Sequence, residues 1–277
     1  MKKINPIVIL FRHGQTDYNA EKRFQGQQNC PLNMNGLEQV QKTGEVISDL
    51  LEDIFNKFPN SKIAECRTSD LQRSVLSAQV VSKVISKRLG KNINFMNEPK
   101  LREYHAGELE NYTIDEYLKK NPGKLEKYFS DYKEDPLNAK YPGENSESWN
   151  MVSTRILPFL VDLNQAFISQ LADNPQIDLM HENSVQDIYI WSTHGGVIRN
   201  FLSLMQICDF NTSFIEVGNG DVLLLKPSLV IESHELKDKQ LNSSALLNDR
   251  LVTWELLKHV KIGDSITVLT DLSTLIK

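Results

Sequence analysis

Short apolar runs rich in β-branched residues alternate along the chain with longer segments in which apolar positions recur every three or four residues. Continuous apolar runs of about four to eight residues are typical of strands that are buried on both faces of a parallel sheet. We predict such strands at 7–11, 63–66, 93–96 and 187–193, and weaker ones at 214–218, 222–226, 228–233 and 265–270.

The longer periodic segments predict helices, and polar residues mark where they begin. A glycine in the left-handed conformation commonly ends a helix. The helices predicted in this way run from Asn33 or Asn35 to Phe58, from Ser69 or Asp70 to Leu89 with Gly90 beyond it, from Asn145 or Ser146 to Phe167, and over 197–205 and 250–259. Pro158 lies inside the third of these helices and should kink or break it.

Because strand and helix patterns alternate, we expect an α/β fold of three layers, α/β/α, with a mostly parallel sheet covered by helices on both faces. No Pro/Gly/Ser-rich linker divides residues 1–277, so we expect a single domain. Residues 104–148 lack one dominant period and contain several proline and glycine turns, which favours a lid of short helices from about Thr113 onward. From about residue 235 we expect a C-terminal extension.

Composition narrows the function. The net charge is −5 and the sequence pI is about 5.7, with no dense run of Lys or Arg. Proteins that bind nucleic acid without sequence preference need a basic face, so we expect no nucleic-acid partner. The three cysteines are far apart and form no C-x-x-C pair, and no apolar stretch is long enough to span a bilayer. We therefore expect a cytoplasmic protein that does not bind membranes; the oligomeric state stays open.

Polar motifs follow the predicted strands in a fixed order. The sequence R-H-G-Q-T-D-Y-N occupies residues 12–19, S-D-L-Q-R-S residues 69–74, L-R-E residues 101–103 and T-H-G-G-V-I-R residues 193–199. Together they resemble the signatures of the histidine phosphatase superfamily, the phosphoglycerate-mutase-like proteins, over residues 7 to about 226. Ligands of open α/β sheets bind beyond the carboxyl ends of the strands, where these motifs lie. The resemblance implies a phosphatase that passes the phosphoryl group through a histidine.

The residue types fit that chemistry. A phosphomonoester carries about two negative charges, and its transfer spreads charge over the phosphoryl oxygens. Arg12 and Arg73 supply planar forks that bind such oxygens, and Asn19 adds a neutral donor. His13 can accept the phosphoryl group if it is neutral, with its other ring nitrogen held by a backbone carbonyl. His194 adds a further donor to the transferring oxygens.

Small and amide-bearing residues complete the expected phosphate site. Gly14, Gly195 and Gly196 would let the backbone approach the phosphate closely. The resemblance also covers Gln25 and Gly26, which we expect to line the mouth of the substrate site. For Gln25, an amide that stabilises its own loop is an equal alternative.

The resemblance implies that Glu103 is the general acid. An alkoxide leaves poorly without a proton, so a carboxylic acid must protonate the leaving oxygen. After release, the carboxylate can activate the water that hydrolyses phosphohistidine. Glu108 and Glu110 lie close in sequence and remain alternatives for this role.

Three functions compete. The first is a phosphatase acting on a small phosphorylated metabolite, with a phosphoprotein also possible. The second is a cofactor-dependent phosphoglycerate mutase, but mutases resemble one another in an Arg-His-Tyr-Gly run after the acid and in paired arginines beyond it. Here Y-H-A-G occupies residues 104–107, and residues 104–154 contain no arginine. The third is a catalytically weak binding or regulatory member.

We expect the chemistry to need no cofactor and no metal. The sequence has no H-E-x-x-H or related histidine spacing. The arginines beside the candidate histidines would repel a cation, which argues against a histidine-based metal site.

Overall fold

The apolar run near the start of the chain forms the central strand β1 (Ile4–Arg12) of a six-stranded sheet. The strand order is β3-β2-β4-β1-β5-β6, with β2 at Lys62–Thr68, β3 at Met96–Asn97, β4 at Val185–Thr193, β5 at Val222–Leu229 and β6 at Val252–Val260. Strands β1 to β4 are parallel, whereas β5 is antiparallel to β1 and β6 is antiparallel to β5. This computed structural model describes residues 4–172, 185–208, 215–229 and 252–262.

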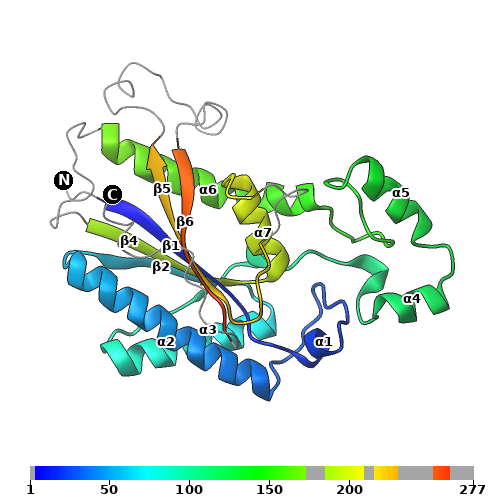
Figure 1. Cartoon of the computed structure of the whole chain (residues 1–277), viewed down its shortest axis with the longest axis horizontal. Helices are drawn as coiled ribbons and strands as arrows, with labels where there is room; N and C mark the ends of the chain where they lie inside the picture. The colour runs from blue at the N-terminus through cyan, green and yellow to red at the C-terminus, as the bar shows by residue number, and fades with distance from the viewer. Residues whose placement is uncertain (1–3, 173–184, 209–214, 230–251, 263–277) are drawn as a thin grey trace.

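Helices cover both faces of the sheet (Figure 1). Ile7, Ile9 and Phe11 of β1 pack with α2 (Met34–Lys57) and α3 (Gln72–Leu89). The alternate residues Val8 and Leu10 pack with α6 (Trp149–Ala172) and α7 (Gly195–Leu204) on the other face. Successive side chains of a strand point to opposite faces, so a strand buried on both sides must be apolar throughout. The α/β/α sandwich with a mostly parallel sheet is the fold class expected from the sequence.

The ends of the helices follow local chemistry. Asn33 caps α2, accepting a hydrogen bond from the Gly36 amide at 2.9 Å, as predicted. Gly90 ends α3 with a φ of 65°, also as predicted. The predicted cap of α3 at Ser69 or Asp70 is wrong, because α3 begins after Leu71, which gives no side-chain cap. Both polar side chains make contacts outside this helix instead, which are described with the candidate site.

Helix α6 also begins later than predicted. The Ser148 hydroxyl accepts a hydrogen bond from the Met151 amide at 3.3 Å, while Ser146 bonds back to the carbonyl of Gly143. The first turn therefore belongs to Ser148 and not to Asn145 or Ser146. Pro158 lies inside a helix that continues to Ala172, so a break at this proline is wrong.

The strand predictions fail at the sheet edges. The third strand is Met96–Asn97 instead of 93–96, and residues 215–218 are not a strand. In the predicted helix at 250–259, the residues from Val252 onward belong to the strand β6, which pairs with β5. Residues 250 and 251 lie outside the described residues. The spacing of the apolar residues in β6 is compatible with a helix or with a strand. The pairing with β5 determines that this segment forms a strand. Strand β5 reaches Leu229; the rest of 228–233 and the strand at 265–270 lie outside the described residues.

Short helices lie to one side of the sheet, in the region expected to be a lid (Figure 1). They are the 3-10 turn η2 (Gly107–Leu109) and the helices α4 (Ile114–Lys120) and α5 (Glu126–Glu134), preceded by the turn η1 (Pro99–Leu101). Thr113 and Glu116 form a capping box at the start of α4. Ala106, Leu109, Tyr117 and Leu125 form a small core of their own.

Candidate active site

Segments that follow β1, β2 and β4 meet at the carboxyl edge of the sheet. The His13 amide donates to the carbonyl of Thr193, and the Ser69 amide donates to that of Ser192, both at 3.0 Å. These two bonds continue the backbone contacts of the sheet beyond the ends of β1 and β2. A cavity of about 180 Å³ opens at this edge, lined among others by Arg12, His13, Asn19, Gln25, Gly26, Arg73 and Glu103.

His13 is held as a neutral ring with one defined tautomer. Its Nδ1 lies 2.7 Å from the carbonyl oxygen of Gly14. Because a carbonyl only accepts, Nδ1 carries the proton and Nε2 keeps its lone pair. Burial, followed by the charges of Arg73 and Arg12, lowers the pKa of His13 well below its ordinary value of 6.5. The ring is therefore uncharged at neutral pH.

Asn219 fixes the backbone around His13. Its side-chain amide donates to the His13 carbonyl at 3.1 Å and to Asn19 Oδ1 at 3.2 Å. Asn19 in turn forms a capping box with Thr16 at the start of the short helix α1 (Asp17–Ala20). Sequence reasoning missed Asn219, because it lies outside the recognised motifs and far from His13 along the chain.

Arg12 and Arg73 present buried donors beside the cavity. Arg12 Nη1 donates to the carbonyl of Val217 at 2.7 Å, and Arg73 donates to those of Gln28 and Gly26 at the same distance. Within the described part of the chain, Nε of both arginines has no hydrogen-bond partner. Burial lowers the pKa of Arg12 and lowers that of Arg73 to about 10. A guanidinium keeps its proton at neutral pH in proteins. Buried charged donors without partners suit an anion.

Glu110 holds the loop that Arg73 contacts. Its Oε1 accepts from the Gln27 amide at 2.9 Å and the Ala106 amide at 3.2 Å, and its Oε2 accepts from the Gln28 side chain at 2.7 Å. The carboxylate is 6% exposed and does not line the cavity. Glu110 therefore ties the segment expected to be a lid to residues 26–28, a role that sequence reasoning missed.

Of the three candidate acids, Glu103 lines the cavity. Its Oε2 accepts from the Gly196 amide and its Oε1 from the Tyr104 amide, both at 3.1 Å. Glu108 instead bonds to the Tyr117 hydroxyl and to Lys124 at 2.8 Å. The geometry therefore favours Glu103 over Glu108 and Glu110 as the candidate acid.

Two glycines make room for protein neighbours. A Cβ at Gly196 would lie 2.3 Å from Glu103 Oε1, and one at Gly14 would lie 2.3 Å from the carbonyl oxygen of Gly36. The sequence interpretation assigned these glycines to close approach of phosphate. The structure adds a second reason at both positions: Gly196 leaves room for the carboxylate of Glu103, and Gly14 leaves room for the backbone of α2. The role in phosphate approach stays a prediction.

His194 lies beside His13 but outside the cavity lining. The ring centroids are 5.1 Å apart, and His194 Nε2 is 2.9 Å from the Ser69 hydroxyl. Its Nδ1 has no partner among the residues described. Burial, then the charges of Arg73 and His13, lower the pKa of His194 well below its ordinary value. Gly195 is likewise outside the lining and packs against Arg12.

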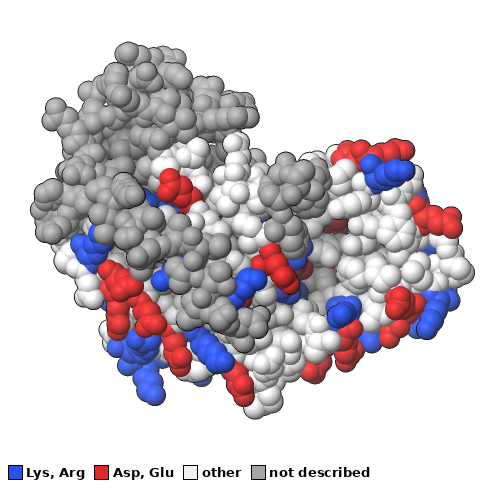
Figure 2. Space-filling view, viewed as in Figure 1, with Lys and Arg blue, Asp and Glu red and all other residues white. Residues whose placement is uncertain are grey.

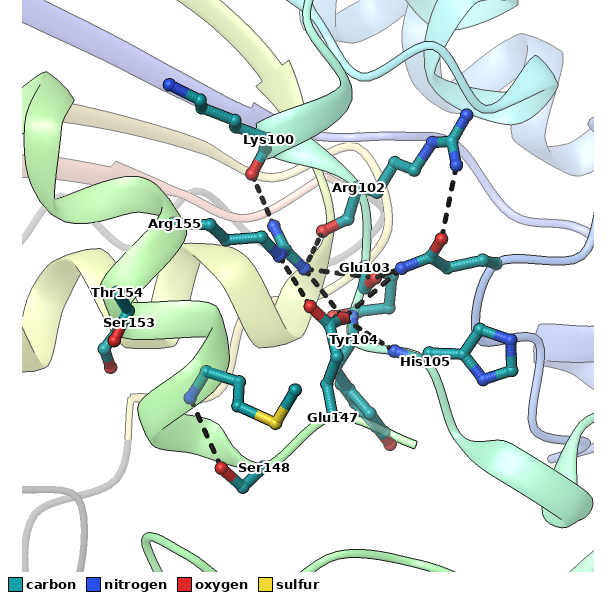
Figure 3. A network of polar contacts seen from close by, with 12 residues as sticks. Lys100, Arg102, Glu103, Tyr104, His105, Glu147, Ser148, Ser153, Thr154 and Arg155 are labelled. Atoms are coloured by element: carbon teal, nitrogen blue, oxygen red, sulfur yellow. Dashed lines mark hydrogen bonds and ion pairs between the residues drawn. The ribbon is translucent and has the colours of Figure 1, made fainter. Parts of the chain in front are cut away.

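A polar network surrounds the backbone of Glu103 (Figure 3). Arg102 binds Asp70 through Nε and Oδ1 at 2.7 Å, and this hydrogen bond lowers the pKa of Asp70. On the other side, Arg155 and Glu147 contact residues 100–105. The network joins the second and third motifs to the start of α6.

Acidic and basic side chains are interspersed over the face seen in Figure 2. Among the described residues, no group of three or more His, Cys, Asp or Glu side chains could hold a metal ion. In the same part of the chain, no helix is both long and apolar enough to cross a membrane.

Several curated proteins are similar to this chain. A probable phosphoglycerate mutase GpmB of Serratia proteamaculans is 34% identical over 39% of this chain, which spans 42% of that protein. An uncharacterized phosphatase PhoE of Bacillus subtilis is 28% identical over 58% of this chain and 65% of its own length. Phosphoglycerate mutase-like protein 4 of Arabidopsis thaliana is 30% identical over 70% of this chain and 68% of its own. The chain thus spans less than two thirds of the first two.

Solved structures share the fold. A mycobacterial glucosyl-3-phosphoglycerate phosphatase superposes with a TM-score of 0.57 at 20% identity, covering 90% of this chain and 96% of that one. A putative alpha-ribazole-5'-P phosphatase of Escherichia coli gives a TM-score of 0.57 at 16% identity, covering 95% and 99%. The family model described as histidine phosphatase superfamily (branch 1) matches residues 8–226. With its motifs gathered at one edge of this sheet, the chain belongs to the histidine phosphatase superfamily.

Proposed function

We propose that the chain is a phosphatase that hydrolyses a phosphomonoester through a phosphohistidine on His13, with Glu103 as general acid and base. The observation that carries this proposal is the state of His13. Its Nδ1 is bonded to the Gly14 carbonyl and its pKa is lowered by burial, so a neutral ring with a lone pair on Nε2 lines the cavity. A nucleophile needs that lone pair.

The reaction has two steps. In the first, His13 Nε2 attacks phosphorus, the bond from phosphorus to the leaving oxygen breaks, and the Glu103 carboxyl gives its proton to that oxygen. In the second, the Glu103 carboxylate takes a proton from water, the water oxygen attacks phosphorus and the P–N bond breaks. Inorganic phosphate leaves, and both side chains return to their starting states.

Charge on the phosphoryl oxygens is met by the buried cations. Arg12 and Arg73 line the cavity and have Nε donors that bond to no described residue. His194 Nδ1 is a further donor beside His13, when the Ser69 hydroxyl donates to Nε2. Because these donor atoms are buried and held in place, they can stabilise the transition state without a metal.

We infer that the substrate is a small phosphorylated metabolite. The cavity is small, about 180 Å³, and Lys22, Phe24 and Tyr104 line it together with the phosphate-binding residues. The names of two structural neighbours, a glucosyl-3-phosphoglycerate phosphatase and an alpha-ribazole-5'-P phosphatase, support this class. A panel of phosphorylated metabolites and phosphopeptides, ranked by kcat/KM, tests it; faster hydrolysis of phosphopeptides would contradict it.

A phosphoglycerate mutase is the second candidate, favoured by the names of the GpmB and Arabidopsis relatives. A mutase must hold the substrate carboxylate while it returns the phosphoryl group. Arg23 lines the cavity but is bound to Glu21 and Glu116. This pairing favours the phosphatase. Isomerisation of phosphoglycerate faster than phosphate release would overturn that choice.

The decisive experiment traps the intermediate. Brief incubation with a labelled phosphomonoester, quenched in alkali, should leave acid-labile, base-stable phosphate on His13. Label that persists in His13→Ala would refute the assignment. Glu103→Gln should slow hydrolysis of an alkyl phosphate by about 10²–10⁴-fold and that of p-nitrophenyl phosphate far less, because p-nitrophenolate leaves without a proton. Equal losses on both substrates would remove Glu103 from the acid role.

A further inference from the structure

Arg155 of α6 and Glu147, which precedes this helix, form an ion pair beside the backbone of the candidate acid Glu103 (Figure 3). Arg155 Nε is 2.9 Å from Glu147 Oε1, and the two side chains are 18% and 15% exposed. Neither residue lines the cavity. Partly buried ion pairs add little net stability on average, so stabilisation of the fold does not by itself explain this pair.

Arg155 binds consecutive parts of the chain that lead into Glu103. Its guanidinium donates to the carbonyl of Lys100, to that of Arg102 at 2.6 Å and to that of Glu103 at 3.2 Å. The turn η1 ends at Leu101 and residue 102 is not helical, so these carbonyls need partners from elsewhere. One planar side chain therefore fixes the backbone on the N-terminal side of the acid.

Glu147 fixes the other side. Its Oε2 accepts from the His105 amide at 2.9 Å and from the Gln27 side chain at 3.3 Å. The same Gln27 amide donates to the Glu103 carbonyl at 3.2 Å. Gln27 belongs to the loop that receives Arg73, so the pair also sets the acid relative to the phosphate-binding residues.

We propose that the Arg155–Glu147 pair is a positioning device for the general acid, an inference that rests on the proposed function of Glu103. Among the residues that the structure describes, two amides, of Gly196 and Tyr104, aim the Glu103 carboxylate. Those two bonds keep their geometry only if the backbone at 103–105 stays in place. An arginine suits this task because its fork reaches three carbonyls and a carboxylate at once, which a lysine cannot do.

The test uses Arg155→Lys and Glu147→Gln with two substrates. For an alkyl phosphate, we expect kcat to fall by about 10²-fold with little change in KM, since a misplacement of about 1 Å has that cost. For p-nitrophenyl phosphate, we expect a change of less than about 3-fold. Arg88→Lys is the matched control: Arg88 also pairs with a carboxylate, Asp49 at 2.7 Å, and donates to a carbonyl, that of Glu45, but lies away from the site. It should leave both rates unchanged.

A double-mutant cycle shows whether Arg155 acts through the acid. In the Glu103→Gln background, Arg155→Lys should cost nothing further on the alkyl phosphate, because the group it positions is gone. Full additivity, equal losses on both substrates or wild-type rates in both variants would overturn the inference. If Arg155→Lys does not fold, Glu147→Gln decides by the same criteria.

The two proposals fail in different ways. If Glu103→Gln alone slows hydrolysis of both substrates equally, the proposed acid role of Glu103 is wrong and the positioning role of the Arg155–Glu147 pair is wrong with it. If Glu103→Gln discriminates between the substrates but Arg155→Lys and Glu147→Gln do not, only the positioning role is wrong.

Discussion

Replacing Gly196 by alanine should disable Glu103, the proposed acid, while leaving His13, the proposed nucleophile, in place. A Cβ at this position would lie 2.3 Å from Glu103 Oε1 and 3.1 Å from both Glu103 Cδ and Tyr104 Cδ1. Ordinary van der Waals contact begins near 3.4 Å, so the carboxylate must retreat by about 1 Å. The Tyr104 ring and the Gly196 amide limit where it can go.

The size of the effect follows from that displacement. A shift of about 1 Å in a catalytic group costs about 10²-fold in rate, or about 2.7 kcal/mol in activation free energy. Gly196 lies in the first turn of α7, where alanine is a better helix former by up to about 1 kcal/mol. We therefore expect a folded variant whose loss comes from the clash.

The assay compares kcat/KM for an alkyl phosphate and for p-nitrophenyl phosphate. Gly196→Ala should lose about 10²-fold on the first and much less on the second. Gly195→Ala is the control: its Cβ would meet the Arg12 guanidinium at 3.3 Å, a contact that small shifts relieve. We expect a smaller loss there, equal for both substrates. Wild-type activity of Gly196→Ala on the alkyl phosphate would refute the reasoning.

Four further outcomes are expected. As the pH is lowered, kcat/KM should decline with a midpoint below pH 6.5, because protonation of His13 at its depressed pKa removes the lone pair of the proposed nucleophile. A midpoint above the ordinary histidine value of 6.5 would contradict this. Below about pH 6.5 the unfolded chain binds more protons at His13 and His194 than the folded chain does, because folding lowers both pKa values. The free energy of unfolding, measured by urea titration, should therefore fall by up to about 1.4 kcal/mol per pH unit for each histidine as the pH drops through this range. Activity should survive exhaustive chelation, because Arg12 and Arg73 supply the charge; loss restored by zinc or magnesium would contradict it. Glu110→Gln should raise KM by about tenfold by loosening the loop that holds Arg73, and an unchanged KM would exclude that role.

The part of the candidate site around His13 could be predicted from the sequence because local rules determine it. An apolar run predicted β1, and Arg12 and His13 follow it in a recognisable motif. Asn33 and Gly90 likewise act within one turn of their own helices. Each of these signals depends on residues a few positions apart, which a sequence displays directly.

Contacts between distant segments could not be predicted in this way. Glu110, Asn219 and Arg155 each contact a site residue or its loop from far along the chain, and each looks like an ordinary polar residue. The strand β6 is a further case, since its pairing with β5 overrides a pattern that also suits a helix. Its His259 bonds to the buried carboxylate of Asp221 at 2.9 Å, in the loop whose backbone contacts Arg12.

The two halves of the site are held by different kinds of structure. The backbone at His13 and Ser69 is bonded to β4, so the proposed nucleophile His13 and Ser69, the partner of His194, lie on extensions of the sheet. Glu103 follows a 3-10 turn outside the sheet, and side chains from α6 and the lid hold its backbone. Backbone contacts of a sheet change little with sequence, whereas the contacts made by the Arg155 and Glu147 side chains depend on those particular residues. Substitutions at the end of the lid should therefore alter proton transfer to the leaving group before they alter phosphate binding.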